Sequence, residues 1–122
     1  MYTVAIELPF SAAHQLRFVN GEKEPLHGHN WRVKVEVSTS SLDSQGLVID
    51  FERLKRETKG ILQRLDYTFI NEVPPFDKIN PSAENIAFHI YQELVKALKT
   101  DPICIEKVTV WETEDAQASY IP

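Results

Sequence analysis

The segment Leu26–Val37, "LHGHNWRVKVEV", predicts a long β-strand whose two faces differ in polarity. From Trp31 onward, apolar residues alternate with polar or charged ones, which is the period-two pattern of a strand with one buried face. His27 and His29 have the same parity as the apolar residues and therefore lie on the same face. Two histidines on one face, in a chain with only four, suggest that a ligand binds between them.

A second alternating segment precedes this one. From Tyr2 to Ala12 the even positions are mostly apolar, and His14 continues the row at its end. If the two strands pair as an antiparallel hairpin, the end of the first meets the start of the second, which brings His14 toward His27 and His29.

The middle of the chain predicts two helices. After the turn-forming "SSLDSQGL", apolar residues recur at three- and four-residue spacing, as in an amphipathic helix: Phe51, Leu54, Thr58, Ile61, Leu62 and Leu65. A proline-containing loop, "NEVPPFDKINP", precedes a second stripe made of Ile86, Ile90, Leu94 and Leu98. Either Asn80 or Ser82 can cap the start of this second helix.

The last part of the chain predicts a strand through about Glu112, a polar turn, and a short strand near Ser119 to Ile121. The element order is then β-β-α-α-β-β. This order predicts an α+β fold in which two helices cover one face of a four-stranded antiparallel sheet. Such a sheet has two open edges, and association with other subunits is one way to cover them.

Length and composition indicate one domain spanning residues 1–122, with a net charge of −5 and no basic stripe. Nucleic acid is therefore not an expected partner. The segment "MYTVAIELPF" lacks a basic region followed by a long apolar run, and no apolar run is long enough to cross a membrane, so we expect a cytoplasmic protein. The single Cys104 lies in an alternating apolar segment and is predicted to be buried.

The three histidines are the strongest chemical signal. Three neutral imidazoles on converging strand ends are typical of a catalytic zinc site, which keeps a fourth position open for water or substrate. Gly28, between two of them, allows close approach of a bulky group. On the residues alone, separate histidines in the core or at its rim remain the alternative.

Six segments, in order along nearly the whole chain, resemble the 6-pyruvoyl-tetrahydropterin synthase and 6-carboxytetrahydropterin synthase family: "FSAAHQL", "LHGHNW", "GLVIDFERLK", "LDYTFIN", "NPSAENIA" and "VWETEDAQASY". The resemblance implies the tunnelling fold, in which the sheets of three subunits close into a trimeric barrel. Two trimers then stack into a homohexamer, and the pterin substrate binds between subunits.

Carried over by position, the resemblance implies that His14, His27 and His29 bind Zn²⁺ and that Glu112 anchors the pterin. A carboxylate can accept two N–H donors from an aminopyrimidine edge, as it does from a guanidinium. Ser82 stands where the family often has a threonine near the pterin. On the residues alone, Glu112 is a solvated strand-end residue and Ser82 a helix cap.

The chain also departs from the family pattern. The family's catalytic cysteine, four residues before the first histidine of the HGH motif, is replaced by Lys23. Glu24, three residues before that histidine, resembles the type III branch, in which a glutamate replaces the cysteine. Asp66 is kept, but Tyr67 stands where histidine is usual, and an unperturbed tyrosine pKa of about 10 makes it a poor proton shuttle. We expect Glu24 and Asp66 to be catalytic; without the resemblance they are a loop and a turn carboxylate.

The activity implied by the resemblance is that of a zinc-dependent lyase acting on 7,8-dihydroneopterin triphosphate. With Glu24 as base, cleavage of the side chain would give 6-hydroxymethyl-7,8-dihydropterin, a folate precursor. The alternatives are a 6-carboxytetrahydropterin or 6-pyruvoyl-tetrahydropterin synthase, an inactive zinc- and pterin-binding homologue, and a structural zinc domain. The pathway stays open between folate, queuosine and biopterin. Lys23 and Arg17 are candidate cations for the triphosphate.

Overall fold

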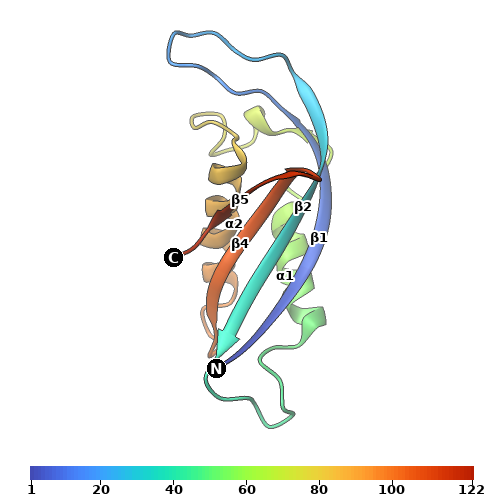
Figure 1. The fold of residues 1–122 in the computed structure, drawn as a ribbon, viewed down its shortest axis with the longest axis vertical. Coiled ribbons are helices and arrows are strands. Elements are labelled where there is room, and N and C mark those ends of the chain that lie inside the picture. Colours follow the sequence, from blue (N-terminus) through green and yellow to red (C-terminus); the bar gives the residue numbers. More distant parts are fainter.

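The computed structural model describes all 122 residues, and its longest feature is a β-hairpin (Figure 1). Strand β1 (Tyr2–His14) pairs antiparallel with β2 (His27–Thr39) along its whole length. Their register places His14 opposite His27 and Ala12 opposite His29. The predicted hairpin is therefore confirmed, together with the convergence of the histidine-bearing strand ends.

The sheet has five strands in the order β3-β1-β2-β4-β5. Strands β4 (Cys104–Thr113) and β5 (Ala116–Tyr120) form the predicted C-terminal hairpin. Strand β3 (Thr68–Phe69) pairs parallel to β1 and is followed by the 3-10 helix η1 (Ile70–Glu72). The sequence did not predict these two elements because segments of two and three residues are too short to show a periodicity.

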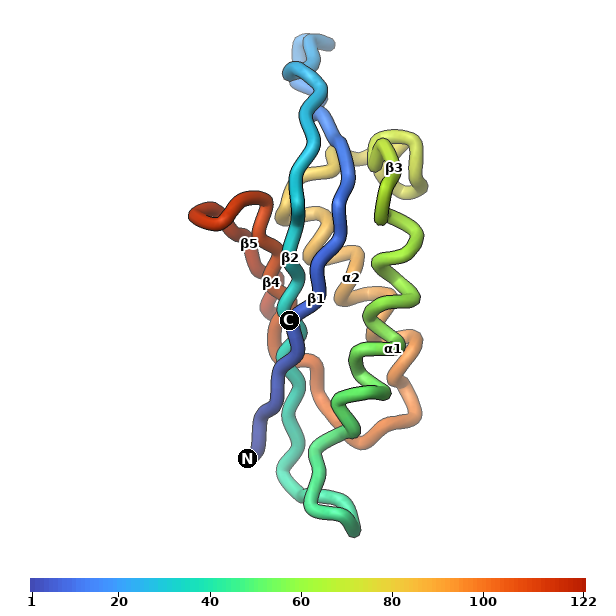
Figure 2. Tube along the Cα trace, turned by 90° about the vertical axis from the view of Figure 1, so that its right-hand side faces the viewer, coloured from blue at the N-terminus to red at the C-terminus, as the bar shows by residue number.

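Two helices lie on one face of the sheet (Figure 2). Helix α1 (Phe51–Leu62) begins where the Asp50 carboxylate accepts the Glu52 N–H at 3.0 Å. Helix α2 (Ala83–Ala97) begins where the Ser82 hydroxyl accepts the Asn85 N–H at 3.1 Å. Of the two predicted caps, Ser82 is the one the structure uses.

The core lies between the helices and this face of the sheet. Val33, Val35 and Val37 on β2 are fully buried, and the same row continues into Trp31, which is 1% exposed. Trp31 stacks on Phe10 with a centroid distance of 5.6 Å, and its indole N–H donates to a backbone carbonyl of β1. This pair marks the boundary between the apolar half of the hairpin and the half that carries the histidines.

One prediction about the core is wrong. Cys104 is exposed, because it begins β4 on the face opposite the helices, whereas Ile103 and Ile105 on either side pack against the core. The alternation along β4 was predicted correctly, but Cys104 was placed on the buried face of the strand instead of the exposed one. Neither helix has the length and apolar character required to span a bilayer.

Both edges of the sheet are open within one chain. The outer edge of β1 is paired only at Ala12 and Ala13, where β3 joins it, and β5 has no further neighbour. Such edges are normally covered in natural proteins. The hairpin loop between β1 and β2 extends beyond the helices, at the top of Figure 1.

Candidate metal centre

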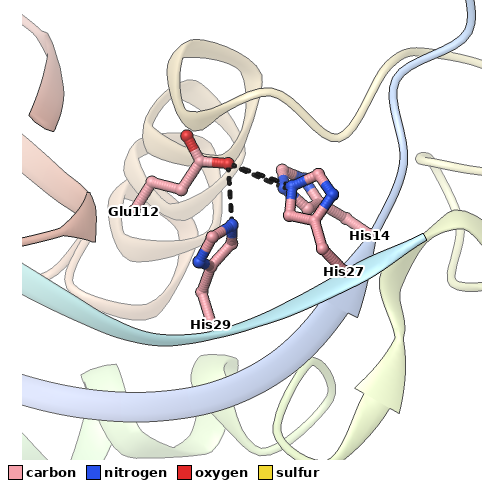
Figure 3. A group of neighbouring side chains, drawn as sticks. All are labelled: His14, His27, His29 and Glu112. Carbon is pink, nitrogen blue, oxygen red and sulfur yellow. Dashed lines mark hydrogen bonds and ion pairs between the residues drawn. The ribbon is translucent and has the colours of Figure 1, made fainter. Parts of the chain in front are cut away.

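Four side chains from three strands converge at the end of the β1–β2 hairpin (Figure 3). They are His14 on β1, His27 and His29 on β2, and Glu112 on β4, and their potential ligand atoms all lie within 4.8 Å of one another. His14 is 2% exposed, while the other three are partly exposed. The sequence predicted the histidines as a group but did not predict that Glu112 contacts them.

Backbone carbonyls fix the orientation of two of the rings. The Nδ1 atom of His14 lies 2.7 Å from the Pro81 carbonyl oxygen, and Nδ1 of His27 lies 2.8 Å from that of Pro25. Because a carbonyl oxygen only accepts, each Nδ1 carries the hydrogen and donates it. In the neutral rings, Nε2 is then unprotonated and free to bind a metal, as is usual for histidine ligands supported by a second hydrogen bond.

The centre of the cluster contains acceptors without donors. The two Nε2 atoms of His14 and His27 are 2.9 Å apart, and one Glu112 oxygen lies 2.8 Å from Nε2 of His14. With neutral rings, these lone pairs repel one another unless a cation lies between them. The geometry therefore fits a bound cation better than a network of hydrogen bonds.

His29 supports the same conclusion. Its Nε2 atom is buried and has no hydrogen-bond partner, which is costly for a polar atom unless a ligand satisfies it. Burial lowers the pKa of His29 below its ordinary value, more strongly than the Glu112 carboxylate raises it. The ring is therefore neutral near pH 7, as a metal ligand must be. Imidazole and carboxylate donors suit Zn²⁺ among the common biological cations.

Glu24 lies beside this cluster. Its side chain is partly buried, and one carboxylate oxygen accepts the Leu16 N–H at 2.9 Å and lies 3.7 Å from Nε2 of His27. The loop that connects β1 to β2 thus returns the carboxylate to the start of β2. Glu24 therefore lies next to the histidines, and its catalytic part stays a prediction.

Two asparagines that sequence reasoning did not select hold the end of β1. Asn71 accepts the Gln15 N–H at 3.0 Å and donates to the Gln15 carbonyl at 2.8 Å. Asn80 makes the same pair of bonds with Arg17, at 2.8 and 2.9 Å. Each side-chain amide therefore makes the two hydrogen bonds that the backbone of a residue in a neighbouring strand would make. We call these two residues the asparagine clamp; they fix the backbone on either side of Leu16, whose N–H binds Glu24.

The side chain of Arg17 is hydrogen-bonded to backbone carbonyls in the same region. Its guanidinium donates to the carbonyls of Asn71, Phe76 and Ile79, at 3.3, 2.7 and 3.2 Å. It therefore ties the hairpin loop to the segment before α2, and within this chain it is not free to bind a phosphate. Of the two cations proposed from the sequence, only Lys23 is exposed.

Comparison with known proteins identifies the family. The profile of the 6-pyruvoyl tetrahydropterin synthase family matches residues 3–122 of this chain. The chain belongs to this family. It is accordingly a lyase of the pterin synthase type, as the sequence motifs indicated.

Individual members are similar over most of their length. A 6-carboxy-5,6,7,8-tetrahydropterin synthase of Synechocystis is 32% identical over 125 residues, which cover 98% of this chain and 93% of the relative. A dihydroneopterin monophosphate aldolase of Pyrococcus furiosus is 33% identical over 103 residues, covering 84% and 82%. The Caenorhabditis elegans 6-pyruvoyl tetrahydropterin synthase structure superposes with a TM-score of 0.83 at 25% identity, covering 100% of this chain and 97% of that one.

Asp66 lies outside the histidine cluster of its own chain. Its carboxylate accepts the Ser11 N–H at 2.8 Å, and the adjacent Tyr67 N–H donates to the Ser11 carbonyl at 2.6 Å. Tyr67 has a φ of 57°, unusual for a residue other than glycine, and its side chain is 88% exposed. A catalytic part for Asp66 stays a prediction, and it would require that another subunit bring Asp66 to the histidines.

Ser82 also lies outside the cluster, since its hydroxyl caps helix α2. Its neighbour Pro81 is the residue that contacts the cluster, through the carbonyl that accepts from His14. A contact between Ser82 and the pterin stays a prediction.

Proposed function

We propose that this member of the family cleaves the side chain of a phosphorylated 7,8-dihydroneopterin and releases 6-hydroxymethyl-7,8-dihydropterin. The observation that carries the proposal is the position of Glu24, whose carboxylate lies 3.7 Å from Nε2 of His27 while the family's cysteine is absent. The name of the Pyrococcus relative, an aldolase acting on dihydroneopterin monophosphate, supports this type of cleavage.

Substrate binding is assigned to Glu112 at the end of β4. Its carboxylate, 32% exposed, can accept two N–H donors of the aminopyrimidine edge. The pterin ring would then lie beside the histidines with its side chain directed toward them and toward Glu24.

Zn²⁺ is the ion we propose for the three histidines. A divalent ion bound by His14, His27 and His29 would supply Lewis acidity that lowers the pKa of a substrate hydroxyl. Glu24 then takes the proton from the hydroxyl on the second side-chain carbon. The bond between the first and second carbons breaks, its electron pair passes into the pterin ring, and the phosphorylated fragment leaves as an aldehyde. Glu24 returns the proton to the first carbon, so that atoms and charge balance.

The number of phosphates on the substrate is a separate question. The sequence motifs predicted a triphosphate, whereas the Pyrococcus relative is named for the monophosphate. Because the guanidinium of Arg17 is held by carbonyls, a triphosphate would depend on Lys23 and on cations of other subunits.

The alternative function is that of a 6-carboxytetrahydropterin synthase, which the Synechocystis relative supports. It would need a base other than cysteine. Cys104 begins β4 and Glu112 lies eight residues further along the same strand, which separates them by about 25 Å. Cys104 therefore cannot replace the missing cysteine in the site of its own chain.

We also propose that the chain forms a homohexamer made of two barrel-like trimers. The open edges of β1 and β5 support this assembly, because pairing β5 of one subunit with β1 of the next would close the sheet. Analytical ultracentrifugation tests it directly, and a monomer at micromolar concentration would contradict it.

The activity is tested by incubating zinc-loaded protein with 7,8-dihydroneopterin monophosphate and triphosphate separately and identifying products by mass spectrometry. We expect 6-hydroxymethyl-7,8-dihydropterin from at least one substrate and its loss in Glu24→Gln. Glu22→Gln, an exposed residue of the same loop, is the matched control and should retain activity. A 6-carboxy or 6-pyruvoyl product would favour the alternative function, and binding without turnover would indicate an inactive homologue.

A further inference from the structure

We propose that Gln15 is a positioning residue for Glu24: its side-chain amide holds the Glu24 backbone so that the carboxylate faces the histidines. This role rests on the proposed function of Glu24 as the base. It adds to the site a residue that touches neither the metal ligands nor the reacting carboxylate with its side chain, and that acts only through the loop between β1 and β2.

The pairing of the two strands shifts by one residue at the start of this loop. The last pair of the regular ladder is His14 with His27. In the loop, the Glu24 N–H donates to the Leu16 carbonyl at 3.1 Å, so these two residues lie opposite each other. Between the two pairs lies one residue on the first strand and two residues on the second. Two residues opposite one define a β-bulge, which redirects the neighbouring side chains.

The bulge determines which face of the hairpin carries Glu24. Alternation continued backwards from His27 would place Glu24 on the face opposite the histidines. The extra residue reverses this, and one Glu24 oxygen lies 3.7 Å from Nε2 of His27. The two bulged residues, Pro25 and Leu26, are both exposed, and a proline has no N–H for a ladder bond. The backbone between Glu24 and the regular ladder therefore depends on side chains for support.

Gln15 gives this support through an exchange of hydrogen bonds. In a regular hydrogen-bonded antiparallel pair, the Leu16 N–H would donate to the Glu24 carbonyl. Here the Gln15 amide donates to that carbonyl at 3.0 Å, and the Leu16 N–H donates to the Glu24 carboxylate at 2.9 Å. A hydrogen bond from a backbone N–H to a carboxylate is charge-assisted and strong. The exchange therefore fixes the carboxylate as well as the backbone of Glu24.

The backbone of Gln15 is held independently of its side chain. The Asn71 side chain, one half of the asparagine clamp, binds both the N–H and the carbonyl of Gln15, at 3.0 and 2.8 Å. Removing the Gln15 amide should therefore leave the clamp and the neighbouring His14 in place and release only Glu24. The expected signature is a loss of rate without a loss of metal.

The first test compares steady-state kinetics of zinc-loaded proteins on the dihydroneopterin phosphate that the wild type cleaves. Gln15→Met keeps the side-chain length but removes the donor, so the Leu16 N–H should return to the Glu24 carbonyl. We expect kcat to fall by about tenfold to a hundredfold, because a catalytic group displaced by about 1 Å loses this much. KM, zinc affinity and the urea midpoint should not change.

Two further variants separate positioning from a general disturbance of the loop. Gln15→Lys keeps an N–H donor and should recover most of the rate. Gln92→Met, at an exposed position of α2, is the matched control and should behave like the wild type. An unchanged kcat in Gln15→Met, or a loss of zinc affinity that parallels the loss of rate, would overturn the proposal.

The second test observes the exchanged hydrogen bond and needs no turnover. The Leu16 amide resonance is followed by NMR in deuterated protein that contains ¹⁵N-labelled leucine. Glu24→Ala should shift this resonance strongly in the wild-type background, because the N–H loses the carboxylate, and only slightly in Gln15→Met, where that bond is already lost. Equal shifts in both backgrounds would overturn the proposed role of Gln15. A failure of the proposed cleavage would leave this result unaffected, so the two proposals can fail separately.

Discussion

The β1–β2 hairpin has an apolar half, at its open end, and a histidine half, next to the connecting loop. Both halves follow one register, but their inward-facing side chains differ in chemistry. In the first half, Val33, Val35 and Val37 face the helices opposite Leu8, Ile6 and Val4. In the second half, the same row carries His27 and His29 opposite His14 and Ala12. The side chains of the apolar half are stabilised by burial, whereas those of the histidine half are acceptors that need a cation. One strand pattern can therefore specify a core and a binding site in succession.

The largest expected effect is the loss of zinc affinity when a histidine of the cluster is removed. His27→Ala should weaken zinc binding by about a thousandfold, because one of three nitrogen ligands is lost. Since His27 is 34% exposed, folding should change little. Metal content after dialysis and chelator competition measure the effect. His89→Ala, which removes the histidine outside the cluster, is the control, and equal metal loss in both variants would contradict the assignment.

Weakening the core against which the apolar half packs should lower stability and leave zinc affinity unchanged. Leu54 on α1 is fully buried, and Leu54→Ala should lower the free energy of unfolding by about 2–5 kcal/mol through lost burial and a cavity. The zinc affinity of the folded protein should stay within about twofold, because additivity holds for distant sites. Urea denaturation at one fixed protein concentration measures the stability. A change below about 1 kcal/mol would mean that the helix–sheet core relaxes around the site.

The asparagine clamp holds the backbone that follows His14, next to the histidine half, and sharpens the comparison. Asn71→Ala leaves the Gln15 N–H and carbonyl without their partners and should lower the free energy of unfolding by about 1–3 kcal/mol. Because Gln15 follows His14, zinc affinity should also fall, by about tenfold. Asn20→Ala, in the exposed hairpin loop, is the control. A loss of stability with unchanged zinc affinity would show that the clamp does not position the site.

The smallest effect concerns His89 on α2, which packs against Phe76 with a centroid distance of 5.2 Å. Burial lowers the pKa of His89, with Arg64 and Lys96 adding to this and Glu93 opposing it. The unfolded chain then binds more protons than the folded one as the pH falls below about 6.5, so stability decreases on acidification until the lowered pKa is passed. His89→Gln should make this decrease shallower in metal-free protein, measured by urea denaturation between pH 7.5 and 5. An identical slope would contradict the assignment.

Much of the fold and the histidine cluster could be predicted from the sequence because they depend on local periodicity. Alternation gave β1 and β2, and their pairing followed from chain order, which brought His14 to His27. Spacing of three and four residues gave α1 and α2, although Leu65, predicted in the helical stripe, lies beyond the end of α1 in a turn.

The rest depends on contacts that no local pattern encodes. The contact between Glu112 and His14 joins residues 98 positions apart, and it follows from a β-bulge that the alternation of β4 does not reveal. The side chains of Asn71 and Asn80 replace strand residues, yet in the sequence they look like ordinary loop amides. Cys104 was misplaced for another reason: alternation in the sequence does not determine which face of a strand is buried.

Trp31 gives the molecule an optical reporter of its own metal site. The buried indole lies edge-on to His14 and His29, at centroid distances of 4.8 and 5.6 Å, while the other tryptophan, Trp111, is partly exposed beside Arg32. Binding of copper or cobalt between the histidines should therefore quench the emission of Trp31 more strongly than that of Trp111. Occupancy of the site can then be followed by intrinsic fluorescence, without any label and without substrate.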